Sequence, residues 1–125
     1  MGEIYLAVDG DDVGHRLEYL MLMNEREAIT KFSKTFLEAM IWLENKLVKD
    51  FDALIVFTGG DNLLASLNDL PTEVIEALRS EFAKRSNTTL SIGLGENPRQ
   101  AYFALKLAKT SGKNCIRHFK ELANG

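Results

Sequence analysis

The chain has 125 residues and one cysteine, and its 15 Lys and Arg against 18 Asp and Glu give a formal net charge of −3. We expect residues 1–125 to form a single domain without an internal disulfide. No stretch approaches the roughly 20 apolar residues that span a bilayer. The N-terminus lacks a secretion signal, so we expect a cytoplasmic protein with no membrane contact. The missing surplus of Lys and Arg argues against a duplex nucleic acid partner, whereas a ligand with a few phosphates is compatible.

The first half of the chain predicts a strand and two helices. Residues 4–8 form a short apolar strand that leads into the acidic segment 9–12, and a short helix follows from about residue 13 to 23. Asn24, with Glu27 three residues later, predicts an N-cap and capping box for the next helix. That helix carries an apolar stripe for a core at Ala28, Ile29, Phe32, Phe36, Met40, Leu43 and Leu47.

The middle of the chain predicts a hairpin followed by a helix and a strand. The continuous apolar run 53–57 indicates a strand buried on both faces. Residues 58–61 form a tight turn, and 62–67 return as the second strand. Pro71 marks the start of a helix, and the alternating residues 89–94 predict another strand. The helix after Pro71 turns three apolar side chains inward, Val74, Leu78 and Phe82.

The last long helix has clear signals at both ends. Asn97 is the expected cap, Pro98 the first helical residue, and Gln100 the partner in a capping box. Gly112 occupies the position of a C-terminal glycine. Residues 114–118 are a candidate short final strand.

The order of these elements predicts an α+β fold of the ferredoxin-like type. Strand, helix, strand, strand, helix and strand are two split units joined by a hairpin, with helices packed on an antiparallel central sheet. In this topology the first and third strands are antiparallel neighbours at the centre of the sheet. The end of the first strand, Asp9, therefore lies beside the start of the third, Asp61.

Two carboxylates at one edge of a sheet repel each other unless a cation lies between them. Mg²⁺ or Mn²⁺ is the natural candidate because both prefer oxygen ligands, and Mg²⁺ often combines one or two carboxylates with substrate phosphates. We therefore expect Asp9 and Asp61 to hold a divalent metal ion that positions a nucleoside triphosphate.

Glycines in the two adjoining loops allow a bulky ligand to approach the backbone. Gly59 and Gly60 belong to the hairpin turn, and Gly10 and Gly14 to the opposing loop. The helix beginning near Val13 would direct its N–H groups at that ligand, as helices do toward phosphate. The alternatives are a plain hairpin turn for residues 59–62 and a solvated acidic loop or helix cap for residues 9–12.

Taken together, these motifs resemble the palm domain of GGDEF diguanylate cyclases and CRISPR polymerase subunits. Within that group the chain looks most like the minimal CRISPR polymerases, which are stand-alone palm domains. The resemblance covers nearly the whole chain and depends on four segments in the family's order: residues 9–14, 59–65, 91–93 and 104–114.

The resemblance implies particular roles for individual residues. Metal ligation falls to Asp9, the Gly10 carbonyl and Asp61, and the two aspartates are the catalytic residues. Lys109 and Lys113 match positions whose basic side chains touch phosphate in GGDEF relatives. The complete set expected to bind the nucleotide is Asp12, Val13, Gly14, Gly59, Gly60, Asn62, Lys109 and Lys113.

The resemblance also implies a function. That function is the metal-dependent synthesis of a cyclic oligonucleotide from nucleoside triphosphates, with ATP favoured. The expected context is antiphage defence, in which a separate effector protein senses the product. Joining two nucleotides requires each to present a hydroxyl to the other's α-phosphate. One domain of this size offers one triphosphate site, so a homodimer with facing sites is expected.

One residue departs from the GGDEF pattern. Asn62 stands where active cyclases have a carboxylate, and residues 51–54 lack the Arg-x-x-Asp product-inhibition site. GTP cyclohydrolase III of archaea carries a GGDN turn on a related palm, so GTP ring hydrolysis is a second hypothesis. A catalytically silent nucleotide sensor is a third.

Overall fold

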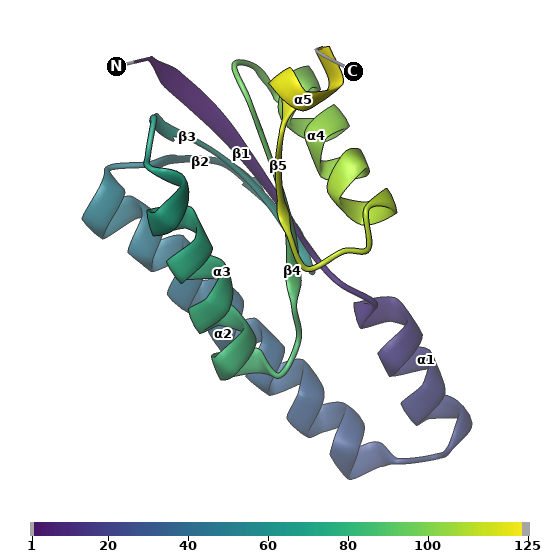
Figure 1. The fold of residues 1–125 in the computed structure, drawn as a ribbon. Coiled ribbons are helices and arrows are strands. Elements are labelled where there is room, and N and C mark those ends of the chain that lie inside the picture. The colour runs from purple at the N-terminus through teal and green to yellow at the C-terminus, as the bar shows by residue number, and fades with distance from the viewer. Residues whose placement is uncertain (1, 124–125) are drawn as a thin grey trace.

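The computed structural model describes residues 2–123, which form an α+β fold (Figure 1). One five-stranded sheet carries helices on both faces, and α1 extends past the end of the sheet. In chain order the elements are β1 (Glu3–Gly10), α1 (Val13–Leu22), α2 (Arg26–Phe51), β2 (Leu54–Thr58), β3 (Asn62–Asn68), α3 (Thr72–Ser86), β4 (Leu90–Gly95), α4 (Pro98–Thr110), β5 (Ile116–His118) and α5 (Phe119–Ala123).

The strand order is β2-β3-β1-β4-β5, which confirms the predicted ferredoxin-like topology. β1 lies at the centre and pairs antiparallel with β3 on one side and with β4 on the other. The expected final strand is present as β5, and it pairs parallel to β4 at the sheet edge. The sheet is therefore mostly antiparallel with one parallel pair.

α2 and α3 cover one face of the sheet, and α4 lies on the other face (Figure 1). The main core forms under α2 and α3 because the inward side of β1, β3 and β4 is apolar and α2 presents its stripe to it. Its largest fully buried side chains are Phe82, Leu6, Leu47, Leu63, Ile75, Leu90, Leu94 and Val8. A smaller cluster under α4 contains Ala7, Leu64 and Ala101.

α4 approaches β4 so closely that two glycines are required there. A Cβ atom on Gly93 would lie 2.2 Å from the backbone nitrogen of Leu105 and 2.4 Å from the Ala101 carbonyl oxygen. A Cβ on Gly95 would lie 2.6 Å from the nitrogen of Ala101. Because these contacts hold α4 over β4 and β1, the helix leaves the β3 and β2 end of the same face uncovered.

The expectation that residues 53–57 form a strand buried on both faces is wrong. β2 is an edge strand, and its Leu54 is 68% exposed. The physical reason is the position of α4, which lies over the opposite half of the sheet and cannot cover β2. The apolar run therefore produces an exposed edge instead of a buried centre.

The predicted cap at Asn24 is also wrong, whereas the cap at Asn97 is confirmed. Asn24 has φ 57° and its N–H donates to the Met21 carbonyl, so it ends α1, and α2 starts at Arg26. At α4, Asn97 Oδ1 accepts a hydrogen bond from the Gln100 N–H at 2.9 Å. Gln100 Oε1 in turn accepts from the N–H of Glu96, one residue before the cap.

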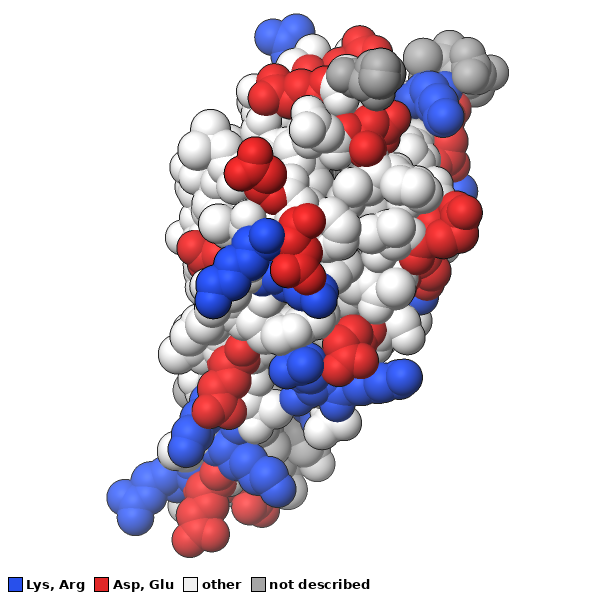
Figure 2. Space-filling view, turned by 90° about the vertical axis from the view of Figure 1, so that its left-hand side faces the viewer, with Lys and Arg blue, Asp and Glu red and all other residues white. Residues whose placement is uncertain are grey.

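Charges of both signs are mixed on the side of the molecule that carries α2 and α3. Figure 2 shows Lys and Arg interspersed with Asp and Glu there, so neither sign forms a continuous band on that face. Within residues 2–123, no helix has both the length and the apolar character needed to span a membrane.

Candidate functional site

The ends of β1 and β3 bring Asp9 and Asp61 together, as the topology predicts. Asp9 is the register partner of Asn62, the residue that follows Asp61. The Gly10 N–H donates to the Asp61 carbonyl oxygen at 2.8 Å, which fixes the hairpin turn against the end of β1. Burial raises the pKa of the Asp61 carboxyl, and the negative charge of Asp9 raises it further. Each carboxylate therefore lies within the electrostatic influence of the other.

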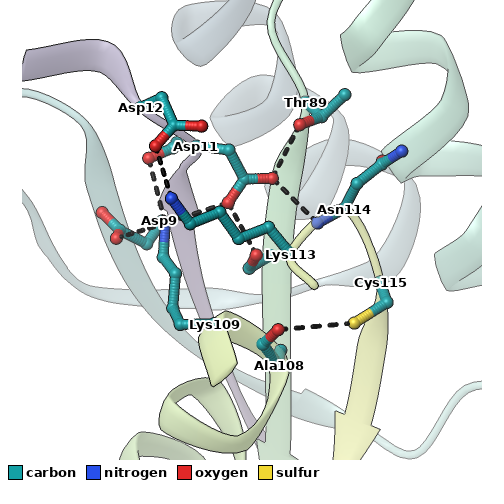
Figure 3. Close-up of polar contacts among 11 residues, drawn as sticks. Asp9, Asp11, Asp12, Thr89, Ala108, Lys109, Lys113, Asn114 and Cys115 are labelled. Carbon is teal, nitrogen blue, oxygen red and sulfur yellow. Dashed lines mark hydrogen bonds and ion pairs between the residues drawn. The ribbon is translucent and has the colours of Figure 1, made fainter. Parts of the chain in front are cut away.

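Lys109 projects from the last turn of α4 into this site (Figure 3). Its ammonium lies 2.8 Å from Oδ2 of Asp9, 2.9 Å from Oδ1 of Asp11 and 3.1 Å from the Gly10 carbonyl oxygen. Burial alone would lower the pKa of Lys109, but its hydrogen bonds to Asp9 and Asp11 raise it above the ordinary value. The side chain therefore remains a cation surrounded by oxygen atoms.

Asp11 is a buried carboxylate to which the sequence analysis gave no role of its own. Its side chain is only 4% exposed, and both oxygens accept hydrogen bonds. The donors are the hydroxyls of Thr89 at 2.7 Å and Ser91 at 2.6 Å, the Lys109 ammonium, and the N–H of Asn114 at 2.9 Å. Burial would raise the pKa of Asp11, but the bonds from Ser91, Thr89 and Lys109 lower it below its usual value.

Asp11 joins three segments that are distant in sequence: the end of β1, the start of β4 and the loop before β5 (Figure 3). The available sequence signal was the pair of hydroxyl residues, Thr89 and Ser91, beside a cluster of acids. Two hydroxyls two residues apart at a strand start face the same side, and a carboxylate is their natural acceptor. The sequence alone does not reveal the register between β1 and β4, which pairs Asp9 with Ser91.

The loop after α4 is built from residues in the left-handed conformation. Gly112, Lys113 and Asn114 have φ values of 106°, 66° and 51°. This backbone turns the Lys113 ammonium toward the Asp12 carboxylate, with which it forms an ion pair. The two predicted lysines thus lie side by side over the β1–α1 loop, Lys109 against Asp9 and Asp11 and Lys113 against Asp12 (Figure 3).

α1 begins directly at the site. Asp12 has φ 58° and precedes the first helical residue, Val13. The first hydrogen bond within this turn runs from the Arg16 N–H to the Asp12 carbonyl, so the N–H groups of residues 13–15 have no acceptor inside the helix. Such groups favour anions.

The glycines divide into two kinds. A Cβ on Gly14 or Gly60 would meet no atom within 4 Å, so both positions are open to an approaching ligand. Gly10, by contrast, is buried, and a Cβ there would meet Val13 at 2.8 Å and Phe36 at 2.9 Å. The expectation that Gly10 opens its loop to a ligand is therefore wrong, because the core needs the glycine. Over Gly59 lies the Asn62 side chain, whose Oδ1 would be 2.2 Å from an added Cβ.

Two hollows flank the carboxylates. The first, called here the α1 hollow, has a volume of about 410 Å³ and adjoins Asp61. The second, the α4 groove, has a volume of about 460 Å³ and adjoins Asp9. Their lining residues are Val13, Gly14, Leu17, Phe32, Ser33, Phe36, Leu37, Gly60 and Asp61 for the α1 hollow, and Ala7, Val8, Asp9, Phe57, Asn62, Leu63, Leu64, Pro98, Tyr102, Leu105, Lys106 and Lys109 for the α4 groove.

The oxygen groups at the carboxylate end fit a hard divalent cation. Two carboxylates and the Gly10 carbonyl are the donor types that Mg²⁺ and Mn²⁺ prefer. Among residues 2–123, no group of three His, Cys, Asp or Glu side chains is placed to hold a metal ion. A cation at Asp9 and Asp61 would therefore complete its shell with the backbone oxygen and with ligand or water oxygens.

Comparison with known proteins identifies the family. Residues 5–119 match the minimal CRISPR polymerase domain. The chain belongs to this family. The match covers the whole site, from β1 through the β2–β3 turn to the loop before β5. No curated protein matched the sequence.

Solved structures place this minimal CRISPR polymerase domain among palm folds. The GGEEF domain of a diguanylate cyclase from Vibrio cholerae gives a TM-score of 0.62 at 14% identity, over 94% of this chain and 82% of that chain. The GGDEF domain of DgcB from Caulobacter crescentus, in complex with c-di-GMP, gives 0.63 at 17%, over 94% and 78%. The Csm1–Csm4 cassette in complex with cA4 gives 0.67 at 20%, over 91% of this chain and only 20% of that chain. At these identities the likeness concerns the fold.

Proposed function

We propose that this domain is a metal-dependent nucleotidyltransferase that makes a cyclic di- or oligonucleotide from nucleoside triphosphates, with ATP as the favoured substrate. The observation that carries the proposal is the adjacency of Asp9 and Asp61 beside the N-terminus of α1. Family membership supports nucleotidyl transfer. Solved relatives that are a diguanylate cyclase or are bound to c-di-GMP or cA4 support a cyclic product.

The triphosphate fits against the first turn of α1. The N–H groups of Asp12, Val13 and Gly14 would donate to phosphate oxygens, and the open positions Gly14 and Gly60 leave room for them. Lys109 and Lys113 would add positive charge on the α4 side. The nucleoside of this donor nucleotide would occupy the α1 hollow, whose volume of about 410 Å³ falls within the range of small-molecule sites.

A divalent metal ion fits the oxygen atoms of Asp9, Asp61 and the Gly10 carbonyl. When bound, it would neutralise phosphate charge and lower the pKa of a hydroxyl in its shell. The chain's own contribution is the placement of the two carboxylates, because the Gly10–Asp61 backbone bond holds them at adjacent strand ends. Asn62, which lies beside Asp9 and over Gly59, adds a polar group without a third negative charge.

The proposed reaction is a series of nucleotidyl transfers, one for each nucleotide in the ring, and a cyclic dinucleotide takes two. A ribose hydroxyl oxygen of one nucleotide attacks the α-phosphorus of the other, a new P–O bond forms, and the bond to the bridging oxygen breaks. Pyrophosphate leaves and the hydroxyl proton is released to water. The last transfer, of the same kind, closes the ring. We propose a two-fold homodimer with facing sites for this closure. In such a dimer the nucleotide bound by one copy faces Asp9 and Asp61 of the other copy.

The proposed product is a signal in antiphage defence, read by a separate effector protein. Family membership in the minimal CRISPR polymerases supports this context. The partners proposed for the domain itself are the nucleoside triphosphate, Mg²⁺ or Mn²⁺, and a second copy of the chain.

The test is incubation with each of the four ribonucleoside triphosphates and Mg²⁺ or Mn²⁺, followed by mass analysis. We expect pyrophosphate and a cyclic product, both abolished in Asp61→Ala and retained in Asp69→Ala, which changes an exposed aspartate distant from the site. A formylated pyrimidine would instead establish GTP ring hydrolysis. Triphosphate binding with no product under any condition would establish a nucleotide sensor.

A further inference from the structure

The cations of this acidic chain are concentrated toward its C-terminal end. Of its 15 Lys and Arg, six lie within residues 97–120, and none of its 18 Asp and Glu does. The α2 and α3 side of the molecule, by contrast, carries both signs mixed (Figure 2). A local surplus of cations attracts anionic partners even where the net charge of the chain is negative.

Three of these six cations already have partners. Lys109 and Lys113 contact the aspartates of the carboxylate site, and Arg117 lies 2.8 Å from the Glu121 carboxylate. The other three are exposed and form no ion pair with any residue of the range 2–123: Arg99, Lys106 and Lys120. Their charge is therefore available to a ligand outside the donor site.

Exposed aromatic rings lie among these cations. Tyr102 and Phe103 on α4 are 51% and 45% exposed, and their ring centroids are 6.1 Å apart. Phe103 stacks on Phe119 of α5 at 6.5 Å, which supports its ring from one side. The Lys106 ammonium lies 5.2 Å from the centre of the Tyr102 ring. Aromatic surface and positive charge are thus available to the same ligand.

One face of α4 carries most of these groups. Arg99, Tyr102, Phe103 and Lys106 follow the spacing i, i+3, i+4 and i+7, which places them on one side of a helix. The opposite side of α4 packs on the sheet through buried alanines, and α5 adds a ring and a cation beside the exposed side. We call this surface the α4 platform; it consists of Arg99, Tyr102, Phe103, Lys106, Phe119 and Lys120.

From these features we propose that the α4 platform binds single-stranded nucleic acid. Bases stack on Tyr102 and Phe103, and the neighbouring cations contact the backbone phosphates. Stacking accepts any base, because every base has a π-face, so we expect little preference for sequence. The platform uses no residue assigned to the donor triphosphate or to the metal ion, and it lies within one chain. The proposal therefore goes beyond nucleotidyl transfer and places no demand on the second copy of the proposed homodimer.

The pair of exposed rings favours a single strand over other polyanions. A duplex keeps the faces of its bases inside the stack, so it would offer phosphates to the cations but no base to Tyr102 and Phe103. An acidic peptide would likewise engage only the cations. Both should therefore bind more weakly than a single strand, which uses the rings and the charge together.

Fluorescence anisotropy with labelled oligo(U) and oligo(dT) of equal length, at low salt and without triphosphate, tests the proposal. Both strands should bind, because the platform contacts bases and phosphates and not the sugar hydroxyl. A blunt duplex of the same length and an oligo-glutamate peptide should each bind at least about tenfold more weakly. Saturation with a non-hydrolysable triphosphate and Mg²⁺ should leave strand binding in place, because the donor site is separate.

Substitutions of the two rings test the stacking contribution. Tyr102→Ala and Phe103→Ala should each weaken strand binding about tenfold. Tyr102→Phe and Phe103→Tyr should retain it, because a ring remains, and these two variants also separate stacking from any loss of folding. The matched control is Tyr19→Ala on α1, where the tyrosine is 61% exposed and lies outside the platform. It should leave binding unchanged.

Substitutions of the cations test the phosphate contacts. In Arg99→Met and Lys106→Met the slope of the logarithm of the binding constant against the logarithm of salt concentration should become shallower by about 0.7, because each variant loses one phosphate contact. Lys84→Met, at an exposed position of α3, should keep the wild-type slope.

Four results would overturn the proposal. The first is the absence of binding by either strand, and the second is duplex or oligo-glutamate binding as tight as that of the single strands. The third is strand binding that survives both alanine variants or that the triphosphate displaces. The fourth is a change of oligomeric state in Tyr102→Ala or Phe103→Ala by analytical ultracentrifugation, which would make the platform a contact between copies. None of these measurements depends on whether the chain makes a nucleotidyl product.

Discussion

The Lys109 ammonium lies 2.8 Å from a carboxylate oxygen of Asp9, and the same group contacts the Gly10 carbonyl. One side chain therefore occupies two of the three oxygen groups proposed for the metal ion. An ammonium and a divalent ion that share these groups repel each other, because both are positively charged. We therefore predict that Lys109 and the metal ion compete, and that Lys109 turns from Asp9 to phosphate when the metal and the triphosphate bind together.

Replacing Lys109 with Met should therefore have opposite effects on two ligands. Mn²⁺ binding without nucleotide should tighten by about tenfold, because a charge-assisted contact of roughly 1.5 kcal/mol or more no longer has to break. Triphosphate binding in the presence of the metal should weaken by a similar factor, because a phosphate partner is lost. Isothermal titration calorimetry measures both. Lys84→Met, at an exposed position of α3, should change neither; weaker Mn²⁺ binding in Lys109→Met would contradict the competition.

Asp61→Asn should separate activity from stability. The ionised Asp61 carboxyl, with its pKa raised by burial and by Asp9, costs folding free energy at neutral pH, and that cost disappears as the pH falls below its folded-state pKa. The amide removes the charge, so the melting temperature at pH 7 should be equal to or above that of the wild type. Product formation should fall at least about a hundredfold, because a metal ligand is lost. A variant that is unstable at pH 7 would contradict the electrostatic account.

Asp11→Asn should be strongly destabilising although Asp11 touches no proposed substrate atom. The substitution removes one of the two carboxylate partners of the half-buried Lys109, leaving Asp9, and turns an amide NH₂ toward hydroxyl or N–H donors, at a cost of about 3 kcal/mol. Because the folded-state pKa of Asp11 is lowered, its contribution is present above the unfolded-state pKa and is lost as the pH falls through the folded-state value.

Urea unfolding of wild type and Asp11→Asn at several pH values measures this contribution. The difference in unfolding free energy should be largest near neutral pH and shrink toward acid. Asp69→Asn, at an exposed carboxylate, should show little difference at any pH. If the difference in unfolding free energy between wild type and Asp11→Asn did not depend on pH, packing and not charge would account for the contribution of Asp11 to stability.

Sequence reasoning located Asp9 and Asp61 because strand order alone brings their two strand ends together. It missed the burial of Asp11, since that depends on side chains from β4 and from the loop before β5. In the segment 9–12, the three aspartates are identical in chemistry, so the sequence does not distinguish the buried acid from the more exposed ones. The register between β1 and β4 makes that distinction.

The exposed β2 strand has a similar cause. An apolar run of five residues indicates a buried strand when helices cover both of its faces. Here α4 lies over β4 and β1 and leaves β2 uncovered. That offset was encoded in Gly93 and Gly95, together with the small residues Ala101, Ala104 and Ala108 on the facing side of α4, all of which are fully buried. Small residues at helical spacing opposite strand glycines indicate close helix–sheet contact, but they do not say which neighbouring strand is left uncovered.

Gly14→Ala tests whether the start of α1 holds the triphosphate. Gly14 is the second residue of α1, and a Cβ there meets no atom within 4 Å, so alanine should stabilise the fold by about 0.5–1 kcal/mol through its helix propensity. A methyl group against the first-turn N–H groups should nevertheless raise the KM of the triphosphate about tenfold, because charge-assisted hydrogen bonds to phosphate would lengthen.

The contrast for this substitution is Gly93→Ala, whose added Cβ would lie 2.2 Å from the Leu105 nitrogen. It should destabilise the fold by about 2–3 kcal/mol because α4 must move away from β4. Urea unfolding and steady-state kinetics on the two variants distinguish a glycine that the ligand requires from one that packing requires. If Gly14→Ala stabilised the fold and kept the wild-type KM, the triphosphate would not lie against the first turn of α1. Lys109 and Lys113 would then be the remaining phosphate-binding groups of the donor site.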